Sequence, residues 1–218
     1  MTLLLAAALA FPSDSPLVAV KLHEPLPRVY HLDFPTRRLL ASTFLRFQES
    51  YESPRFRGKV FTRAEFLSWY GKSSKGSKSD YFDWDGFNVP SRVFAPFYEG
   101  RYDPLDENEK ALLALFAGVK GDFYVIATSG KGSDPGTLRH ELAHGRYATV
   151  PSYRSAAQAL LKEVPLSPVF AMLKRLGYDR SVWEDEAHAW LGDDDADLKA
   201  EGLDPAPYRA VRKRLRAL

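Results

Sequence analysis

Two histidines and a glutamate stand within five consecutive residues of this 218-residue chain, in the segment TLRHELAHGRY (137–147). His140, Glu141 and His144 form the pattern H-E-x-x-H. On a helix, residues i and i+4 lie on one face, so both imidazoles can bind one ion. Glu141 would lie beside a water bound to that ion and could act as a general base. Zn²⁺ suits this set, because it accepts imidazole and carboxylate ligands and leaves a fourth position open.

A catalytic zinc site needs a third protein ligand, which the motif itself does not supply. The metzincin extension of the motif is absent, because Val150 stands where its last histidine would be. The segment SVWEDEAHAWL (181–191) offers Glu184 and Glu186, which fall on different faces of a helix. Glu186 is followed one turn later by the small Ala189, which would let two helix backbones approach closely. We therefore favour Glu186 as the third ligand, with Glu184 as the alternative.

The combination of H-E-x-x-H with a glutamate in a later E-x-x-A-like segment resembles the gluzincin type of zinc metallopeptidase. Here that segment is Glu186-Ala187-His188-Ala189, and the resemblance covers residues 122–191. It implies a zincin-like domain, Zn²⁺ held by His140, His144 and Glu186, and a peptide or protein substrate. Gluzincins often have an aspartate after the alanine, but Trp190 stands there, so the partner that would orient a zinc histidine is not identified.

By the same resemblance, zinc would polarise a peptide carbonyl and Glu141 would accept the proton of the attacking water. The oxyanion that forms then needs a hydrogen-bond donor. The candidates are Tyr147, Tyr153, Arg154 and His188. Of these, we select Tyr153 and His188 as the catalytic candidates beside Glu141. The segments YESPRF, DWDGFNVPS and LRHELAHG also resemble a group of uncharacterised bacterial proteins.

The elements that must position these residues follow from apolar spacing and turn signals. Strands are expected at 17–22, 28–34 and 122–128, and a loop at 81–91. Helices are expected at 36–51, from Thr62, from Asp106, at the motif, and near 152–163, 168–176, 181–191 and 205–217. Strand 122–128, if it forms a sheet edge, could pair with an extended peptide substrate.

Strands early and helices late indicate an α+β protein, which we expect to be zincin-like with a small mixed sheet and a helical C-terminal half. Residues 1–105 would form an N-terminal α/β extension and 106–218 the catalytic region, packed as one unit. The acidic run Asp193–Asp197 lacks the glycine and glutamate of a calcium loop and is interpreted as a solvated turn. The C-terminal YRAVRKRLRAL is expected to pack as a helix with a basic outer face.

Composition excludes several classes of function. The chain has no cysteine, which rules out disulfides, thiolate metal ligands and cysteine nucleophiles. The formal net charge of +2 argues against a dedicated nucleic-acid binder. The apolar first eleven residues are too short to span a bilayer, so we expect no membrane span and a cytoplasmic location. Export is the alternative if they are a truncated signal peptide.

The sequence thus predicts a zinc-dependent hydrolase, and a metallopeptidase before other kinds. One alternative is a non-catalytic regulatory or binding protein that is supported by a metal ion on a zincin scaffold. Glu141 counts against it, because a purely structural site has no use for a base. The other alternative is a metal-dependent hydrolase of a substrate that is not a peptide. The sequence does not indicate an oligomeric state.

Overall fold

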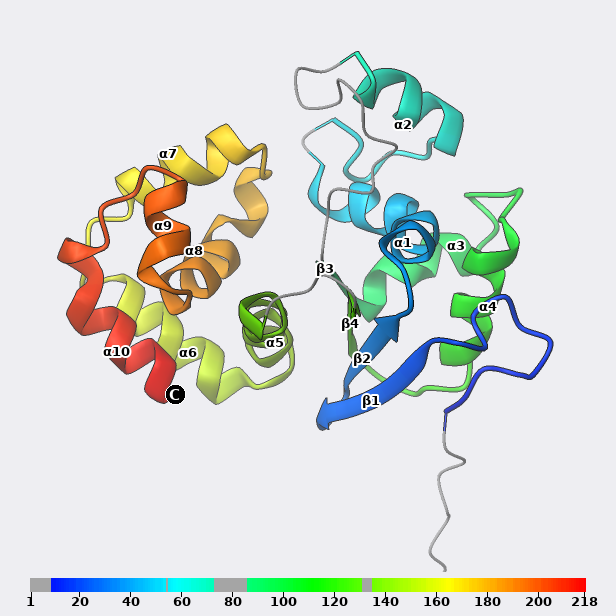
Figure 1. The fold of residues 1–218 in the computed structure, drawn as a ribbon, viewed down its shortest axis with the longest axis horizontal. Coiled ribbons are helices and arrows are strands. Elements are labelled where there is room, and N and C mark those ends of the chain that lie inside the picture. The colour runs from blue at the N-terminus through cyan, green and yellow to red at the C-terminus, as the bar shows by residue number, and fades with distance from the viewer. Residues whose placement is uncertain (1–8, 54, 73–85, 131–134) are drawn as a thin grey trace, which may run out of the picture.

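A four-stranded mixed sheet forms the centre of the N-terminal half (Figure 1). The computed structural model describes residues 9–53, 55–72, 86–130 and 135–218. The strands are β1 (Lys21–Leu26), β2 (Val29–Phe34), β3 (Gly86–Pro90) and β4 (Tyr124–Ser129), in the order β1-β2-β4-β3. β2 runs parallel to β4, while β1 is antiparallel to β2 and β3 is antiparallel to β4.

Two of the sequence expectations for the sheet are wrong. The strand expected at 17–22 begins only at Lys21, because Leu17 to Val20 form turns with backbone bonds such as Val20 N–H to Leu17 C=O. Within the loop expected at 81–91, Gly86–Pro90 forms β3. The rest of that loop up to residue 85, like most of the glycine-rich segment 71–80, lies outside the described residues.

Most of the helices begin where the sequence signals place them. In chain order they are α1 (Arg37–Glu52), α2 (Arg63–Tyr70), α3 (Ala95–Tyr98), α4 (Glu107–Phe116), α5 (Pro135–Thr149), α6 (Pro151–Leu161), α7 (Ser167–Leu176), α8 (Trp183–Gly192), α9 (Asp195–Ala200) and α10 (Arg209–Ala217). Helices α3 and α9 were not expected, and α9 begins within the acidic run interpreted as a turn. Thr62 and Asp106 cap the helices expected to start at them, and each forms a capping box, Thr62 with Glu65 and Asp106 with Glu109. The described chain is therefore α+β, with a small mixed sheet and a helical C-terminal half.

Two hydrophobic cores lie on either side of α5. An aromatic-rich core, with Phe44 and Phe87 stacked 6.0 Å apart, fills the space between the sheet and the helices that precede β4. A second core, which includes Leu173 and Leu191, lies among α6 to α10. Figure 1 shows α5 between the sheet and this helical group. The division at residues 105 and 106 stays a prediction, although β4, beyond it, pairs with β2, before it.

The contact of α5 with the sheet is close because a glycine faces it. An added Cβ on Gly145 would lie only 2.8 Å from Val29 Cγ1 on β2 and 3.4 Å from Ile126 Cδ1 on β4. Leu138, Leu142 and Ala148 of α5 pack around the same sheet residues. The motif helix is thereby held at short range, with His144 directly beside the contact. Within the described part of the chain, no helix is both long and apolar enough to cross a membrane.

We predict that Gly145→Ala lowers the free energy of unfolding by about 1–3 kcal/mol, because the added methyl group overpacks the contact with Val29. Without that contact, alanine in a helix would stabilise the chain by about 1 kcal/mol. Gly118→Ala is the control, because a Cβ there meets no atom within 4 Å. Urea unfolding measures both, and a Gly145→Ala variant at least as stable as wild type would contradict the packing argument.

Candidate metal centre

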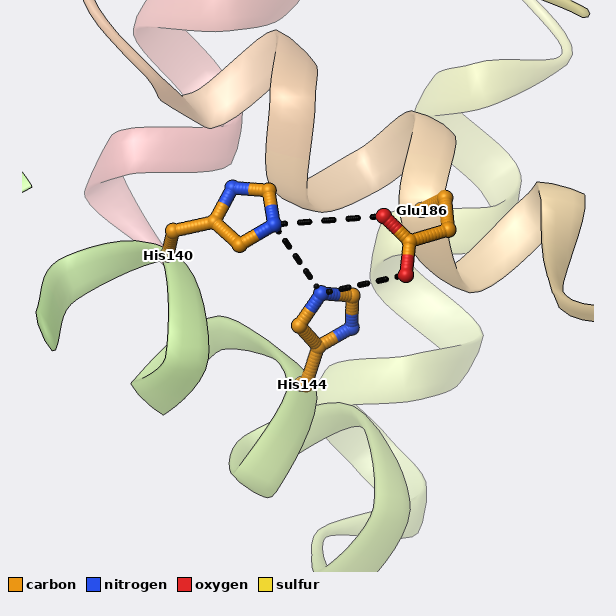
Figure 2. Close-up of side chains that lie close together, drawn as sticks. All are labelled: His140, His144 and Glu186. Carbon is orange, nitrogen blue, oxygen red and sulfur yellow. Dashed lines mark hydrogen bonds and ion pairs between the residues drawn. The ribbon is translucent and has the colours of Figure 1, made fainter. Parts of the chain in front are cut away.

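Helices α5 and α8 bring three possible ligands together (Figure 2). His140 and His144 extend from consecutive turns of α5, and Glu186 extends from α8 toward both rings. The Nε2 atoms of the two histidines lie 3.2 Å apart. Glu186 Oε1 lies 3.6 Å from His144 Nε2, and Oε2 lies 3.9 Å from His140 Nε2. The three ligand atoms lie within 4.8 Å of one another.

These separations fit a small tetrahedral ion. Ligand atoms about 2.1 Å from a tetrahedral Zn²⁺ are separated by about 3.4 Å. Two imidazoles and one carboxylate are also a donor set found in catalytic zinc sites. Glu186 is only 2% exposed, and its buried Oε2 has no hydrogen-bond partner among the described residues. A bound cation would compensate this buried charge, so the three residues fit a metal ion.

An aspartate carboxylate is hydrogen-bonded to the Nδ1 atom of each histidine, the ring nitrogen that does not face the other ligands. His144 Nδ1 lies 2.8 Å from Asp185 Oδ1, and His140 Nδ1 lies 2.7 Å from Asp193 Oδ2. With the Nδ1 hydrogen donated to a carboxylate, the Nε2 lone pair of each ring is free to bind a metal. The sequence reasoning missed both aspartates. Asp193 is 7% exposed, so the interpretation of this residue as part of a solvated turn is wrong.

The C-terminal helix fixes the segment that carries Asp193. Arg212 donates to the carbonyl groups of Leu191 and Asp193, and Arg216 donates to those of Gly192 and Asp193. These carbonyl groups belong to the last turn of α8 and its C-cap, where intrahelical donors run out. Arg212 is only 3% exposed, so the expectation that the basic residues of α10 form an outer, solvent-facing surface is wrong for this residue.

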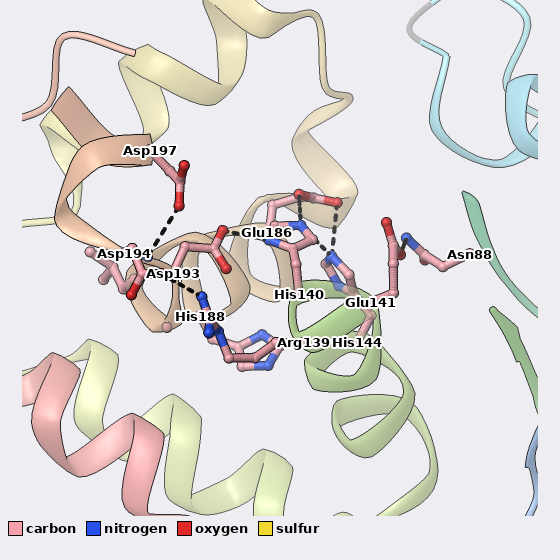
Figure 3. Close-up of polar contacts among 12 residues, drawn as sticks. Asn88, Arg139, His140, Glu141, His144, Glu186, His188, Asp193, Asp194 and Asp197 are labelled. Carbon is pink, nitrogen blue, oxygen red and sulfur yellow. Dashed lines mark hydrogen bonds and ion pairs between the residues drawn. The ribbon is translucent and has the colours of Figure 1, made fainter. Parts of the chain in front are cut away.

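Glu141 lies beside the three ligands and extends toward Asn88 on β3 (Figure 3). Its Oε2 accepts a hydrogen bond of 2.7 Å from Asn88 Nδ2, and Tyr124 donates its hydroxyl to Asn88 Oδ1. A Cβ on Gly86 would lie 2.7 Å from Glu141 Oε1. The amide of Asn88 and the absent side chain of Gly86 therefore fix the direction of this carboxylate. Neither contact was found from the sequence.

The metal-free centre carries more acidic than basic groups. Burial raises the pKa of Glu186 to about 7, against the lowering effect of His144 and His140. Burial would lower the pKa of His144, but the charges of Asp185 and Glu186 outweigh it and raise that pKa well above its usual value. Burial raises the pKa of Glu52 on α1, and the negative charge of Glu186 raises it further.

Tyr178 is a further residue that the sequence reasoning missed. Burial raises the pKa of its phenol well above the usual value, and the charges of Glu186, Glu52 and Glu141 raise it further. The phenol is therefore near enough to these three carboxylates for their charges to act on it. The residue precedes Glu186 by eight positions in the loop between α7 and α8, a region without a periodic pattern from which its direction could be read.

Tyr153 and His188 lie next to the centre, because the His188 ring centroid is 6.0 Å from that of His144 and 5.8 Å from that of Tyr153. They line a cleft of about 500 Å³ with Leu138, Leu142 and Arg146, on a row of α5 nearly opposite His140 and His144. Burial lowers the pKa of His188 to about 4, so the ring is neutral near pH 7. Its Nδ1 hydrogen goes to the Asp185 carbonyl, which leaves no hydrogen on Nε2 for an oxyanion.

The remaining candidates are placed as follows. Arg146 lies 4.2 Å from the centroid of the Tyr153 ring, Tyr147 stacks on His188, and Arg154 makes a long bond of 3.5 Å to the Tyr147 carbonyl. The oxyanion role of Tyr153 and of His188 stays a prediction. Glu184 accepts a bond from Gln158 and is not part of the ligand group.

The strand expected to receive a substrate is not at the edge of the sheet. β4 lies between β2 and β3, so pairing of a peptide with residues 122–128 is excluded for the described sheet. β3 is the edge strand beside Glu141. Its Asn88 N–H, which points away from β4, donates to Gln48 Oε1 on α1.

Comparisons with protein-family models, curated proteins and solved structures found no match for this chain. The geometry therefore carries the functional argument alone.

Loss of a residue that hydrogen-bonds to a metal ligand typically weakens metal binding by roughly 10–100-fold. We predict that Glu186→Gln, which removes a ligand itself, weakens Zn²⁺ binding by more than this. The amide keeps the shape of the side chain but removes the charged ligand. Glu184→Gln is the matched control on the same helix, because its partner is Gln158. Competition with a chromogenic chelator measures both affinities. Equal losses, or a larger loss in Glu184→Gln, would show that Glu186 is not the third ligand.

The raised pKa of Glu186 predicts a pH effect on the metal-free protein. Glu186 has a folded pKa of about 7, above its usual value of about 4.3, so folding takes up a proton between these pH values. Wild type should therefore lose stability relative to Glu186→Gln as the pH rises from 5 to 7.5. Thermal melting in a chelator across this range measures the difference. A gap that stays constant or changes in the opposite direction would contradict the shift.

Proposed function

We propose that this protein is a zinc-dependent hydrolase, and specifically a metallopeptidase of the gluzincin kind. The observation that carries the proposal is the triangle of His140, His144 and Glu186 with Glu141 held beside it. Two observations support a resident cation. Each histidine is hydrogen-bonded to a carboxylate through Nδ1, and a buried Glu186 oxygen has no hydrogen-bond partner among the described residues. When bound, Zn²⁺ supplies Lewis acidity, which polarises a carbonyl group and lowers the pKa of water.

Glu141 is the proton acceptor of the proposed reaction. Asn88 binds Oε2, so Oε1 is the oxygen that takes the proton from the attacking water and passes it to the leaving amine. Asn88 is 5% exposed and is itself bound by Tyr124, which prevents the amide from turning away. Asn88 is therefore a positioning residue for the base, held by two strands of the sheet.

Tyr178 supports the proposal as a hydrogen-bond donor to the oxyanion. A tyrosine phenol is protonated at neutral pH and has a hydrogen to donate, and the neighbouring negative charges raise the pKa of Tyr178 further. The charges of Glu186, Glu52 and Glu141 act on its phenol, whereas Tyr153 and His188 line a cleft with Leu138, Leu142 and Arg146 of α5. For this role we therefore propose Tyr178 ahead of the two residues selected from the sequence.

The decisive variant is Glu141→Gln. We predict that it binds Zn²⁺ like wild type and loses about 10²–10⁴-fold in kcat, because only the proton acceptor is removed. Zinc content is measured by mass spectrometry, and hydrolysis is measured on a mixed peptide library. Glu184→Gln is the control and should keep both properties, because it lies outside the ligand group.

Three outcomes would contradict the proposal in different ways. Zinc binding by wild type and by Glu141→Gln, without hydrolysis of any peptide by either, would favour a non-catalytic binding protein. Cleavage of esters or amides that are not peptides would favour a hydrolase of another substrate class. Absence of zinc binding by wild type would remove the metal argument altogether.

A further inference from the structure

A second pocket opens at the C-terminal end of α1, outside the candidate metal centre. Its volume is about 300 Å³, at the lower end of the range for small-ligand sites. Tyr51, Val60 and Pro96 form part of its wall, and three arginines, Arg57, Arg92 and Arg101, line it as well. None of His140, Glu141, His144 or Glu186 lines this pocket. We call it the arginine pocket.

The arginine pocket is strongly basic. Its lining includes three arginines and, among the described residues, no acidic side chain. The guanidinium carbons of Arg57 and Arg92 lie 5.8 Å and 5.3 Å from the centroid of the Tyr51 ring. This ring attracts both cations and holds them at one wall. Both cations line the same pocket, so an anion bound there would be attracted by both.

The three guanidinium groups keep hydrogen-bond donors for a ligand. Arg57 Nη1 is shielded from solvent, yet within the described chain it has no hydrogen-bond partner and only Asp179 Oδ1 at 3.5 Å. Arg92 makes one long bond, of 3.4 Å, to the Tyr51 hydroxyl. Arg101 pairs with Glu99, but both side chains are 57% exposed, so this pair contributes little. A guanidinium group has five N–H donors, and most of these remain available.

We propose that the arginine pocket binds a small oxyanion, a carboxylate or a phosphate group, through Arg57, Arg92 and Arg101. Both groups present oxygens at the spacing of the planar guanidinium fork, which binds them with two parallel hydrogen bonds. Val60, Val93 and Pro96 leave an apolar wall for the carbon skeleton that carries the anion. This assignment requires no metal ion and does not rest on the proposed hydrolase activity.

Tyr51 lines the arginine pocket and is near enough to the metal centre for the charge of Asp185 to act on its phenol. Burial raises the pKa of its phenol, and the charges of Glu52 and Asp185 raise it further. Asp185 is the carboxylate that holds His144. One aromatic side chain thus has two guanidinium groups near its ring and the acidic centre near its hydroxyl.

Isothermal titration calorimetry on the full chain tests the proposal. Phosphate, acetate and chloride are titrated at equal ionic strength into protein kept free of metal, so that no anion can bind through zinc. Phosphate or acetate is expected to bind at least about tenfold more tightly than chloride, because only these two can use the guanidinium forks. The tighter of the two identifies the kind of oxyanion.

The variants assign this binding to the pocket. Arg92→Met should weaken it by about tenfold or more, the usual effect of losing a hydrogen bond to a charged group. Lys213→Met is the matched control, because it removes one positive charge from an exposed position on α10. If Arg92→Met does not fold by circular dichroism, Arg92→Lys keeps the charge without the fork and should still bind more weakly. Binding no tighter than chloride, or equal losses in Arg92→Met and Lys213→Met, would overturn the proposal.

Discussion

Helix α5 packs against the sheet on one side and against α8 on the other, and the candidate metal centre depends on this double contact. On the sheet side, Gly145 lets the helix approach Val29, and Glu141 reaches Asn88. On the other side, His144 reaches Asp185 of α8. A small rotation of α5 would disturb both sets of contacts, so the direction of the base and of the ligands is fixed by one packing arrangement.

Burial of charge is the second constraint on this region. Glu186, His144 and Asp193 are each less than a tenth exposed, and an unpaired charge at such a depth is unfavourable. The chain compensates by pairing each histidine with an aspartate and by fixing the backbone at Asp193 with two arginines. The Glu186 carboxylate has a buried oxygen without a hydrogen-bond partner among the described residues, and it lies where a cation would bind.

Local features of the site could be predicted from the sequence. The i, i+4 spacing places His140 and His144 on one face in any helix, and the face of α8 favours Glu186 over Glu184 without reference to the rest of the fold. The capping residues Thr62 and Asp106 also mark helix starts through contacts three residues away. All of these depend on chain segments of one or two turns.

Features that depend on distant segments could not be predicted. Asn88 meets Glu141 only because β3 pairs with β4 at the edge of the sheet, and a single sequence does not give the strand order. Arg212 is buried because carbonyl groups at the end of α8 accept its hydrogen bonds, which the pattern of charges along α10 does not reveal. Asp193 lies seven residues after Glu186, about two helical turns, so helical spacing could have placed both on one face. Its acidic neighbours indicated a solvated turn instead.

Through its arginines, docking of the C-terminal helix α10 is thermodynamically linked to metal binding. Arg212 and Arg216 hold the backbone of Asp193, which holds His140, so a metal ion would bind best when α10 is docked. At a free concentration one hundred times its Kd, such an ion stabilises the folded state by about 2.7 kcal/mol. The free-ion concentration would then set how often α10 undocks, and hence how readily proteases reach this end of the chain.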